Sequence, residues 1–329
     1  MPPRSIIIDC DPGQDDAVAL FLAMSSPDEL DILGITTVGG NVPLELTQRN
    51  ARMMCDVAGC TEIPVYAGCA DPMIRDAITA EYIHGETGID GMDAFDPATP
   101  LQDEHAVAFI IDTLLATDNV TDTITQATDK VDKVAVTLIP TGPLTNIASA
   151  MVSEPQILDH IDEIVIMGGA MREGGNRTPS AEFNIMADPH AADIVLSCGR
   201  PITMMGLDVT HQVLSTEERV AKIAELSNPV ADATVGMLSF FHRYDTEKYS
   251  SQGTPLHDPC TVAYLLRPDL FKTKHCNVTV ETESELTIGH TAVDFWHVTD
   301  RPKNVNWAFD VDADGFYELL TERLARFPL

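Results

Sequence analysis

Four aspartates lie close together near the start of the chain, directly after an apolar run. Asp9, Asp11, Asp15 and Asp16 follow residues 6–8, and a Pro-Gly pair separates the first two acids from the second two. One acid would be enough to cap a helix, so capping does not explain four. Converging carboxylates repel one another unless a proton or a cation compensates their charge, and such hard oxygen ligands favour Ca²⁺ or Mg²⁺. The spacing therefore predicts a cation site.

The elements that position these acids follow from apolar periodicity. Strands are expected at 5–9, 31–37, 133–139, 162–167 and 202–206. Helices are expected at 15–25, 43–58, 103–116, 142–152 and 189–198. This alternation predicts a parallel sheet covered by helices, and ligands bind such sheets at the carboxyl ends of the strands.

The last third of the chain has a different pattern. Residues 276–281, 287–293 and 304–309 have strand character without intervening helices, so antiparallel additions are expected before a last helix at 312–326. Residues 117–130, rich in Thr and Asp, are interpreted as an irregular surface connection rather than a domain linker. The fold class expected is α/β: a single domain over 1–329 with a Rossmann-like open mixed sheet, covered by helices, and extra antiparallel strands in the C-terminal third.

Composition excludes several classes of function. With 51 acidic residues against 20 Lys and Arg, the formal charge is −31, which argues against a nucleic-acid partner. No apolar span of about 18 residues and no signal-peptide cleavage region is found, so no membrane association is expected. Seven cysteines without a CxxC pair suggest a reducing compartment, and a cytoplasmic location is expected. Neither GxGxxG nor GxxxxGK[ST] occurs, so dinucleotide and P-loop sites are not predicted.

Further polar residues follow the other predicted strands. Asn41, after a Gly-Gly pair, could hold an acid or a water, or could cap the helix that begins near Pro43. Thr141 ends a strand at a turn that leaves its carbonyl without a sheet partner. Asp258, before Pro259, could be a ligand or merely an N-cap.

Residues 167–184 form a long polar segment after an apolar strand. Asn176, Glu182 and Asn184 offer amides and a carboxylate within nine residues. Such a mixture suits the vicinal hydroxyls of a sugar, because each hydroxyl both donates and accepts. Two histidines complete the set of candidates: His257 has the usual pKa range of a proton donor near neutrality, and His84 lies in a Gly-containing loop, although either could be structural.

These segments carry a family resemblance. The run DCDPGQDDAVA at 9–19 resembles the nucleoside hydrolase signature DxDPGxDDAxA. Four further segments resemble the same family in the same order: Val-Gly-Gly-Asn at 38–41, Thr-Gly-Pro-Leu-Thr-Asn at 141–146, the stretch 167–184 that ends in Ala-Glu-Phe-Asn, and His-Asp-Pro-Cys at 257–260. The resemblance implies hydrolysis of the N-glycosidic bond of ribonucleosides.

The resemblance also implies roles for individual residues. The Ca²⁺ ligands would be Asp11, Asp16, Asp258 and the carbonyl of Thr141. Asp11 would also act as general base on water, and His257 would protonate the departing base. The ribose 2′ and 3′ hydroxyls would contact Asp15 and Asn184, and the 5′ hydroxyl would contact Asn176 and Glu182. The substrate pocket would also include Asn41, His84, Met167, Phe183 and Tyr244. A homodimer or homotetramer is expected on the same ground.

Two departures and two alternatives accompany this interpretation. The loop between Met167 and Asn176 is one residue longer than the family pattern, and helix residues 240–249, expected at the base pocket, do not decide among inosine, uridine and cytidine. Asp9-Cys10-Asp11 after a strand also resembles the aspartyl-phosphate loop of haloacid-dehalogenase-type phosphatases, although the following Pro-Gly turn and acids fit it poorly. A non-catalytic Ca²⁺-dependent sugar-binding protein could use the same ligands.

Overall fold

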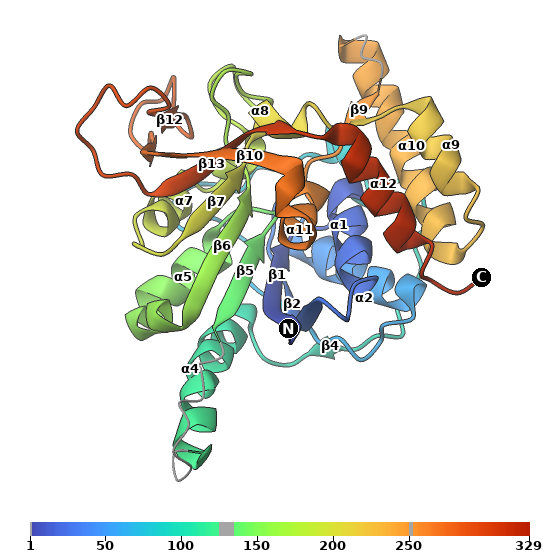
Figure 1. The fold of residues 1–329 in the computed structure, drawn as a ribbon, viewed down its shortest axis with the longest axis horizontal. Coiled ribbons are helices and arrows are strands. Elements are labelled where there is room, and N and C mark those ends of the chain that lie inside the picture. The colour runs from blue at the N-terminus through green and yellow to red at the C-terminus, as the bar shows by residue number, and fades with distance from the viewer. Residues whose placement is uncertain (1, 125–134, 250–252) are drawn as a thin grey trace.

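A nine-stranded sheet runs through the centre of the computed structural model, which describes residues 2–124, 135–249 and 253–329, with the side chains of 117–124 and 242–249 left aside (Figure 1). The strand order is β10-β13-β7-β6-β5-β1-β2-β3-β4, and every neighbouring pair is parallel except β10 with β13. The strands of this sheet are β1 (Arg4–Cys10), β2 (Leu30–Thr37), β3 (Val65–Ala67), β4 (Leu101–Gln102), β5 (Val136–Pro140), β6 (Ile161–Met167), β7 (Ile202–Met205), β10 (Phe271–Cys276) and β13 (Val305–Val311). Two antiparallel pairs lie outside it: β8 (Leu214–Ser215) with β9 (Thr254–Pro255), and β11 (Val278–Val280) with β12 (Thr291–Val293).

Helices follow most of the strands along the chain. They are α1 (Gln14–Met24), α2 (Leu44–Ala58), α3 (Glu81–His84), α4 (Ala106–Ile124), α5 (Thr145–Ser153), α6 (Phe183–Ala187), α7 (Pro189–Leu196), α8 (Leu207–Thr210), α9 (Glu217–Ala224), α10 (Pro229–Tyr249), α11 (Pro259–Leu266) and α12 (Ala313–Leu324). None of the helices in the described part of the chain is long and apolar enough to cross a membrane.

The central strands of the sheet are buried on both faces. Ile6 and Ile8 of β1 pack with residues of α1, α2, α10, α11 and α12, whereas Ile7 packs on the opposite face with residues of α4, α5 and α7. Successive strand residues point to opposite faces, so a strand covered on both sides must be apolar throughout. This explains the uninterrupted apolar run that precedes the aspartates.

The predicted α/β class is confirmed, and the differences lie in particular segments. The helix expected at 103–116 continues to Ile124, so 117–124 are helical and not an irregular connection, and 125–130 lie outside the described residues. The strand expected at 304–309 is β13, which is antiparallel to β10 but parallel to β7, so it extends the main sheet. The strands expected at 276–281 and 287–293 correspond to the antiparallel pair β11 and β12.

The order of the strands determines where the site forms. β7, β6, β5, β1 and β2 are consecutive neighbours and parallel. Their carboxyl ends therefore lie side by side at one edge, and the segments that leave these ends carry the polar residues predicted from the sequence.

Candidate active site

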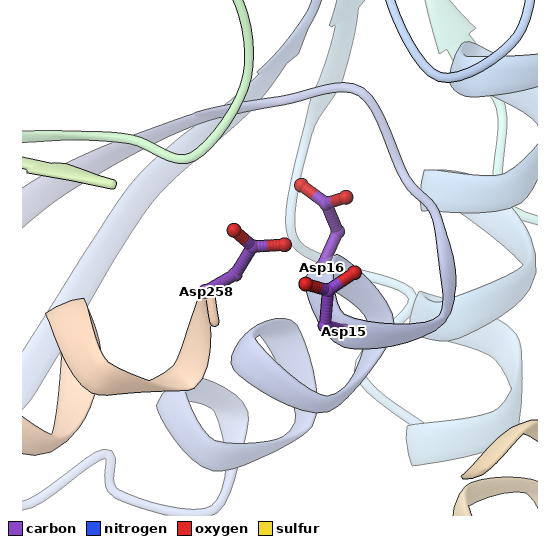
Figure 2. Close-up of side chains that lie close together, drawn as sticks. All are labelled: Asp15, Asp16 and Asp258. Carbon is purple, nitrogen blue, oxygen red and sulfur yellow. The ribbon is translucent and has the colours of Figure 1, made fainter. Parts of the chain in front are cut away.

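Three buried carboxylates meet at this edge of the sheet. Asp15, Asp16 and Asp258 each offer an oxygen, and these oxygens lie within 4.8 Å of one another. Figure 2 shows the Asp258 carboxylate pointing toward the two aspartates from the start of α11, while Asp15 and Asp16 project from the first turn of α1. We call these three residues the carboxylate triad.

The local structure explains why the triad forms. Gly13 ends the turn after β1, and its N–H donates to Asp16 Oδ2 at 2.9 Å, so one acid does cap α1. Asp258 is the residue before the first turn of α11, but within the described chain its side chain makes no capping hydrogen bond. Asp258 is therefore the N-cap of α11 by position only, and its carboxylate points toward Asp15 and Asp16 instead.

Burial and mutual repulsion raise the pKa values of the triad. Loss of solvation is the largest cause, followed by neighbouring carboxylates, and together they raise the pKa of Asp15 to about 7 and that of Asp258 well above its usual range. Burial also raises the pKa of Asp16, although hydrogen bonds from Gly13 and Thr141 oppose that rise. Three acids with raised pKa values in one place are the arrangement that a divalent cation would neutralise.

Asp11 lies beside the triad but does not belong to it. Its Oδ2 accepts a hydrogen bond from the Asn41 N–H at 2.7 Å, and its Oδ1 is buried without a hydrogen-bond partner among the described residues. Gly40 and Gly142 leave room for this carboxylate, because a Cβ on either residue would lie 2.0 or 2.4 Å from its oxygens. An unpartnered buried carboxylate oxygen implies a missing partner such as a cation or a water.

Asn41 and Thr141 connect the acids. The Asn41 amide donates to the Asp11 carbonyl at 3.1 Å and to Asp16 Oδ2 at 3.2 Å. Helix α2 has Pro43 as its N-cap and no side-chain cap, so Asn41 is not a helix cap. The Thr141 hydroxyl donates to Asp16 Oδ1 at 2.8 Å. Its carbonyl accepts from the Asn184 side chain at 2.6 Å, and a second lone pair remains for another partner.

The polar segment 167–184 is held mainly by hydrogen bonds to its own backbone. Glu182 accepts from the N–H groups of Gly169 and Asn184 at 3.0 and 2.9 Å, and Asn176 accepts from the Phe183 N–H at 2.9 Å. Burial raises the pKa of Glu182, and these backbone hydrogen bonds oppose that rise. The side chains of this segment are therefore fixed in place before any ligand binds.

A cavity of about 520 Å³ lies over these residues. The predicted site residues that line it are Asp15, Asn41, His84, Thr141, Met167, Asn176, Glu182, Phe183, Asn184, His257 and Asp258. Asp11 and Asp16 are not among its lining residues, and the side chain of Tyr244 lies outside the described part of the chain. The volume suits a small polar ligand of the size of a nucleoside.

Both candidate histidines are neutral in this structure. Burial lowers the pKa of His257 to about 3, with contributions from His211 and His84, and lowers the pKa of His84 to about 4. The expectation that His257 titrates near neutrality is therefore wrong, because its ring is removed from water. His257 Nδ1 lies 2.7 Å from Thr210 Oγ1, and His84 Nδ1 lies 2.7 Å from Gln14 Oε1.

Several cavity residues were not predicted. Glu173, Arg177 and His211 line the cavity beside the expected residues, together with Phe241 of the segment 240–249 that was expected at the base pocket. His211 follows β7 after one short helix, so its position at the carboxyl edge was a usable signal. Nothing in the sequence pattern marks Glu173, which reaches the cavity through a loop.

Comparisons with known proteins agree with this geometry. The family model "Inosine-uridine preferring nucleoside hydrolase" matches residues 6–318. The chain is 48% identical over 325 residues to a protein of Photobacterium profundum named pyrimidine-specific ribonucleoside hydrolase RihA, covering 98% of this chain and 99% of that one. It is equally identical, 48% over 323 residues, to an uncharacterised protein of Schizosaccharomyces pombe, with 98% and 99% covered.

Solved structures show the same likeness. A purine-preferring ribonucleoside hydrolase from Gardnerella vaginalis superimposes with a TM-score of 0.86 at 34% identity, covering 98% of each chain. The same conclusion follows from the fold, from the position of the acids at the carboxyl edge of the sheet, and from these relatives. The chain belongs to the nucleoside hydrolase family and is a hydrolase that acts on N-glycosyl bonds.

Proposed function

We propose that residues 1–329 form one catalytic domain that hydrolyses pyrimidine ribonucleosides to ribose and free base, with Ca²⁺ as its cofactor. The observation that carries the proposal is the buried carboxylate triad, which lies at a cavity lined by amide and carboxylate groups. Carboxylates and amides can together bind a cation and the hydroxyls of a sugar.

The donor set fits Ca²⁺. Four hard oxygen ligands are available: a carboxylate oxygen of Asp16, one of Asp258, the unpartnered Oδ1 of Asp11 and the Thr141 carbonyl. Asp15 is close enough to bind either the cation or a ribose hydroxyl. When bound, the cation would anchor the ribose and lower the pKa of a water.

The chain's own residues would supply the remaining chemistry. Asp11 would take the proton of the attacking water, since its carboxylate has lone pairs beyond those used by the cation and the Asn41 N–H. Asp15 and Asn184 would hold the 2′ and 3′ hydroxyls. Asn176 and Glu182 would hold the 5′ hydroxyl. The carboxylates would stabilise the positive charge that develops on the sugar.

His257 would interact with the leaving base as a neutral N–H donor. Its low pKa excludes a standing imidazolium, but a neutral ring can still donate one hydrogen bond to a departing nitrogen. His84, whose ring stacks on Phe241 with centroids 5.5 Å apart, would contact the base in the same cavity.

The preference for pyrimidines is supported by the relatives. Proteins named pyrimidine-specific are 42 to 48% identical to this chain, whereas the purine-preferring structure is 34% identical. A homodimer or homotetramer, a cytoplasmic location and a role in nucleoside salvage complete the proposal, and they rest on the family resemblance and the cysteine content.

One assay tests the proposal against the phosphatase and the sugar-binding protein. The enzyme is incubated with uridine, cytidine, inosine, a ribonucleotide and a phosphate ester, in Ca²⁺ or in chelator, and reducing sugar and free phosphate are measured. Ca²⁺-dependent ribose release, fastest from uridine or cytidine, is expected. Phosphate release, or ligand binding without ribose release, would refute it.

A further inference from the structure

A second charged group lies in the cavity, apart from the carboxylate triad. Of the four acidic side chains that line the cavity in the described chain, Asp15 and Asp258 belong to the triad, and Glu182 is occupied by backbone N–H groups. Glu173 differs from them because its side chain is 47% exposed and receives a hydrogen bond from His211. It therefore retains acceptor capacity toward a ligand.

The short helix α8 and the residue that follows it fix the position of Glu173. Asp208 accepts hydrogen bonds from the N–H groups of Met171 and Arg172, both at 2.7 Å, and so fixes the two residues before Glu173. His211, at the end of the same turn, places Nδ1 at 3.2 Å from the Glu173 carboxylate. Since a carboxylate only accepts, His211 Nδ1 carries the hydrogen. This turn therefore holds Glu173 in place.

A series of side-chain contacts connects Glu173 with the carboxylate triad. His257 directly precedes the triad residue Asp258, and its ring lies 5.7 Å from the His211 ring, centroid to centroid. His211 in turn holds Glu173. A row of cavity residues thus begins at the carboxylate triad, in the order Asp258, His257, His211 and Glu173. With the ribose held at the triad, a base that lies along this row of side chains would face His211 and Glu173.

We propose that Glu173 is a specificity-determining residue that accepts a hydrogen bond from the exocyclic amino group of the base, so that cytidine is preferred to uridine. This inference rests on the proposed function above. Uracil presents a carbonyl at the position of that amino group, and two acceptors repel each other. A hydrogen bond to a charged group favours its partner by roughly 10-fold to 100-fold. Glu173 is half-exposed, so about 5-fold to 30-fold is expected.

The experiment varies one group on the base and one on the protein. The ratio of kcat/KM for cytidine over uridine is measured for the wild type, Glu173→Gln and Glu173→Ala, with the riboside of pyrimidin-2-one, which has no group at the 4-position, as reference. The wild-type ratio should exceed about five. Gln can donate to the uracil carbonyl, so the ratio should fall to one or below in Glu173→Gln. In Glu173→Ala, cytidine and uridine should both approach the reference.

Glu218→Gln is the matched control, because Glu218 is an 80% exposed glutamate on α9 that pairs with Lys222. It should leave the ratio unchanged. A wild-type ratio of one or less, an unchanged ratio in both Glu173 variants, or equal losses on all three ribosides would overturn the inference. A wild type that releases ribose from none of the three refutes the proposed function itself, which is a different result.

Discussion

Asp11 is the residue on which the proposed chemistry depends most. Its Oδ1 is buried without a partner among the described residues, and its Oδ2 is fixed by the Asn41 N–H. Asp11→Asn keeps the shape but removes a base and a cation ligand, so turnover of uridine should fall by roughly three orders of magnitude. Steady-state kinetics check this, and Asp28→Asn, at an exposed position, is the control. Near-normal turnover would remove Asp11 from the mechanism.

Asp15 leads to a prediction about the substrate. Its carboxylate is buried and lies in the triad, where a ribose 2′ hydroxyl would be its partner. A 2′-deoxynucleoside leaves that group unmatched, and a mismatch of this kind can cost roughly 10⁴-fold in kcat/KM. Uridine and 2′-deoxyuridine are compared under identical conditions. Similar values for the two would contradict the contact between Asp15 and the ribose.

His257 is tested by the leaving group. A 4-nitrophenyl riboside departs as a stable phenolate and needs no hydrogen-bond donor, whereas uracil departs poorly. His257→Ala should slow uridine hydrolysis by about 10²-fold to 10⁴-fold and barely affect the activated riboside. His275→Ala, on the exposed edge strand β10, serves as control. Equal losses on both substrates would mean that His257 only supports Asp258.

At the scale of elements, the hairpin of β11 and β12 supports the segment that carries Asn176 and Glu182. Thr291 of β12 is buried, accepts from the Ala170 N–H at 2.9 Å and donates to the Ala170 carbonyl at 2.7 Å. Thr291→Val leaves both backbone groups unsatisfied. We expect a loss of about 1 to 3 kcal/mol in the free energy of unfolding by urea, and a higher KM.

Thr273→Val is the control for this prediction, since Thr273 is exposed on β10 and the same change there should leave both quantities unchanged. An unchanged KM in a destabilised Thr291→Val would mean that the hairpin contributes to stability alone.

The elements that could be predicted from sequence are those with a strong period. β1, β2 and β6 are buried in their C-terminal halves, where both faces of the sheet are covered, and their ends predicted where Asp11, Asn41 and Met167 would lie. β10 was missed because its exposed lysines interrupt the apolar pattern. The one-turn helices α6 and α8 are too short to show a period. Glu173 was missed because loop contacts, such as that with His211, leave no periodic signal.

The buried acids of the site make the stability of the whole molecule depend on pH in an unusual direction. Burial raises the pKa of Asp15 to about 7 and those of Asp11 and Asp258 well above their usual range. These folded-state values exceed the unfolded ones, so these acids stabilise the cation-free fold at low pH, and their contribution is lost as pH rises from about 4 through about 7. Burial also raises the pKa of Asp9 to about 7, so Asp9 acts in the same direction.

We therefore predict that in chelator the melting temperature falls between pH 6 and pH 8 by about 2 to 3 °C, the effect of one to two kcal/mol on a chain of this size. Ca²⁺ should raise the melting temperature more at pH 8 than at pH 6, because it binds the ionised acids. Scanning calorimetry measures both. Asp258→Asn should flatten the dependence in chelator. A melting temperature that rises with pH in chelator would contradict the prediction.

The carboxylate triad joins two regions that are made at very different times. Asp16 is near the N-terminus and Asp258 is about 240 residues later, so a growing polypeptide holds only the acids at the start of α1 until α11 has been synthesised and packed against them. Contacts between such distant segments form late in folding. The proposed cation would be held more weakly by two acids alone than by the closed triad, which offers a further oxygen ligand. Retention of that cation would therefore report that the two ends of the fold have come together.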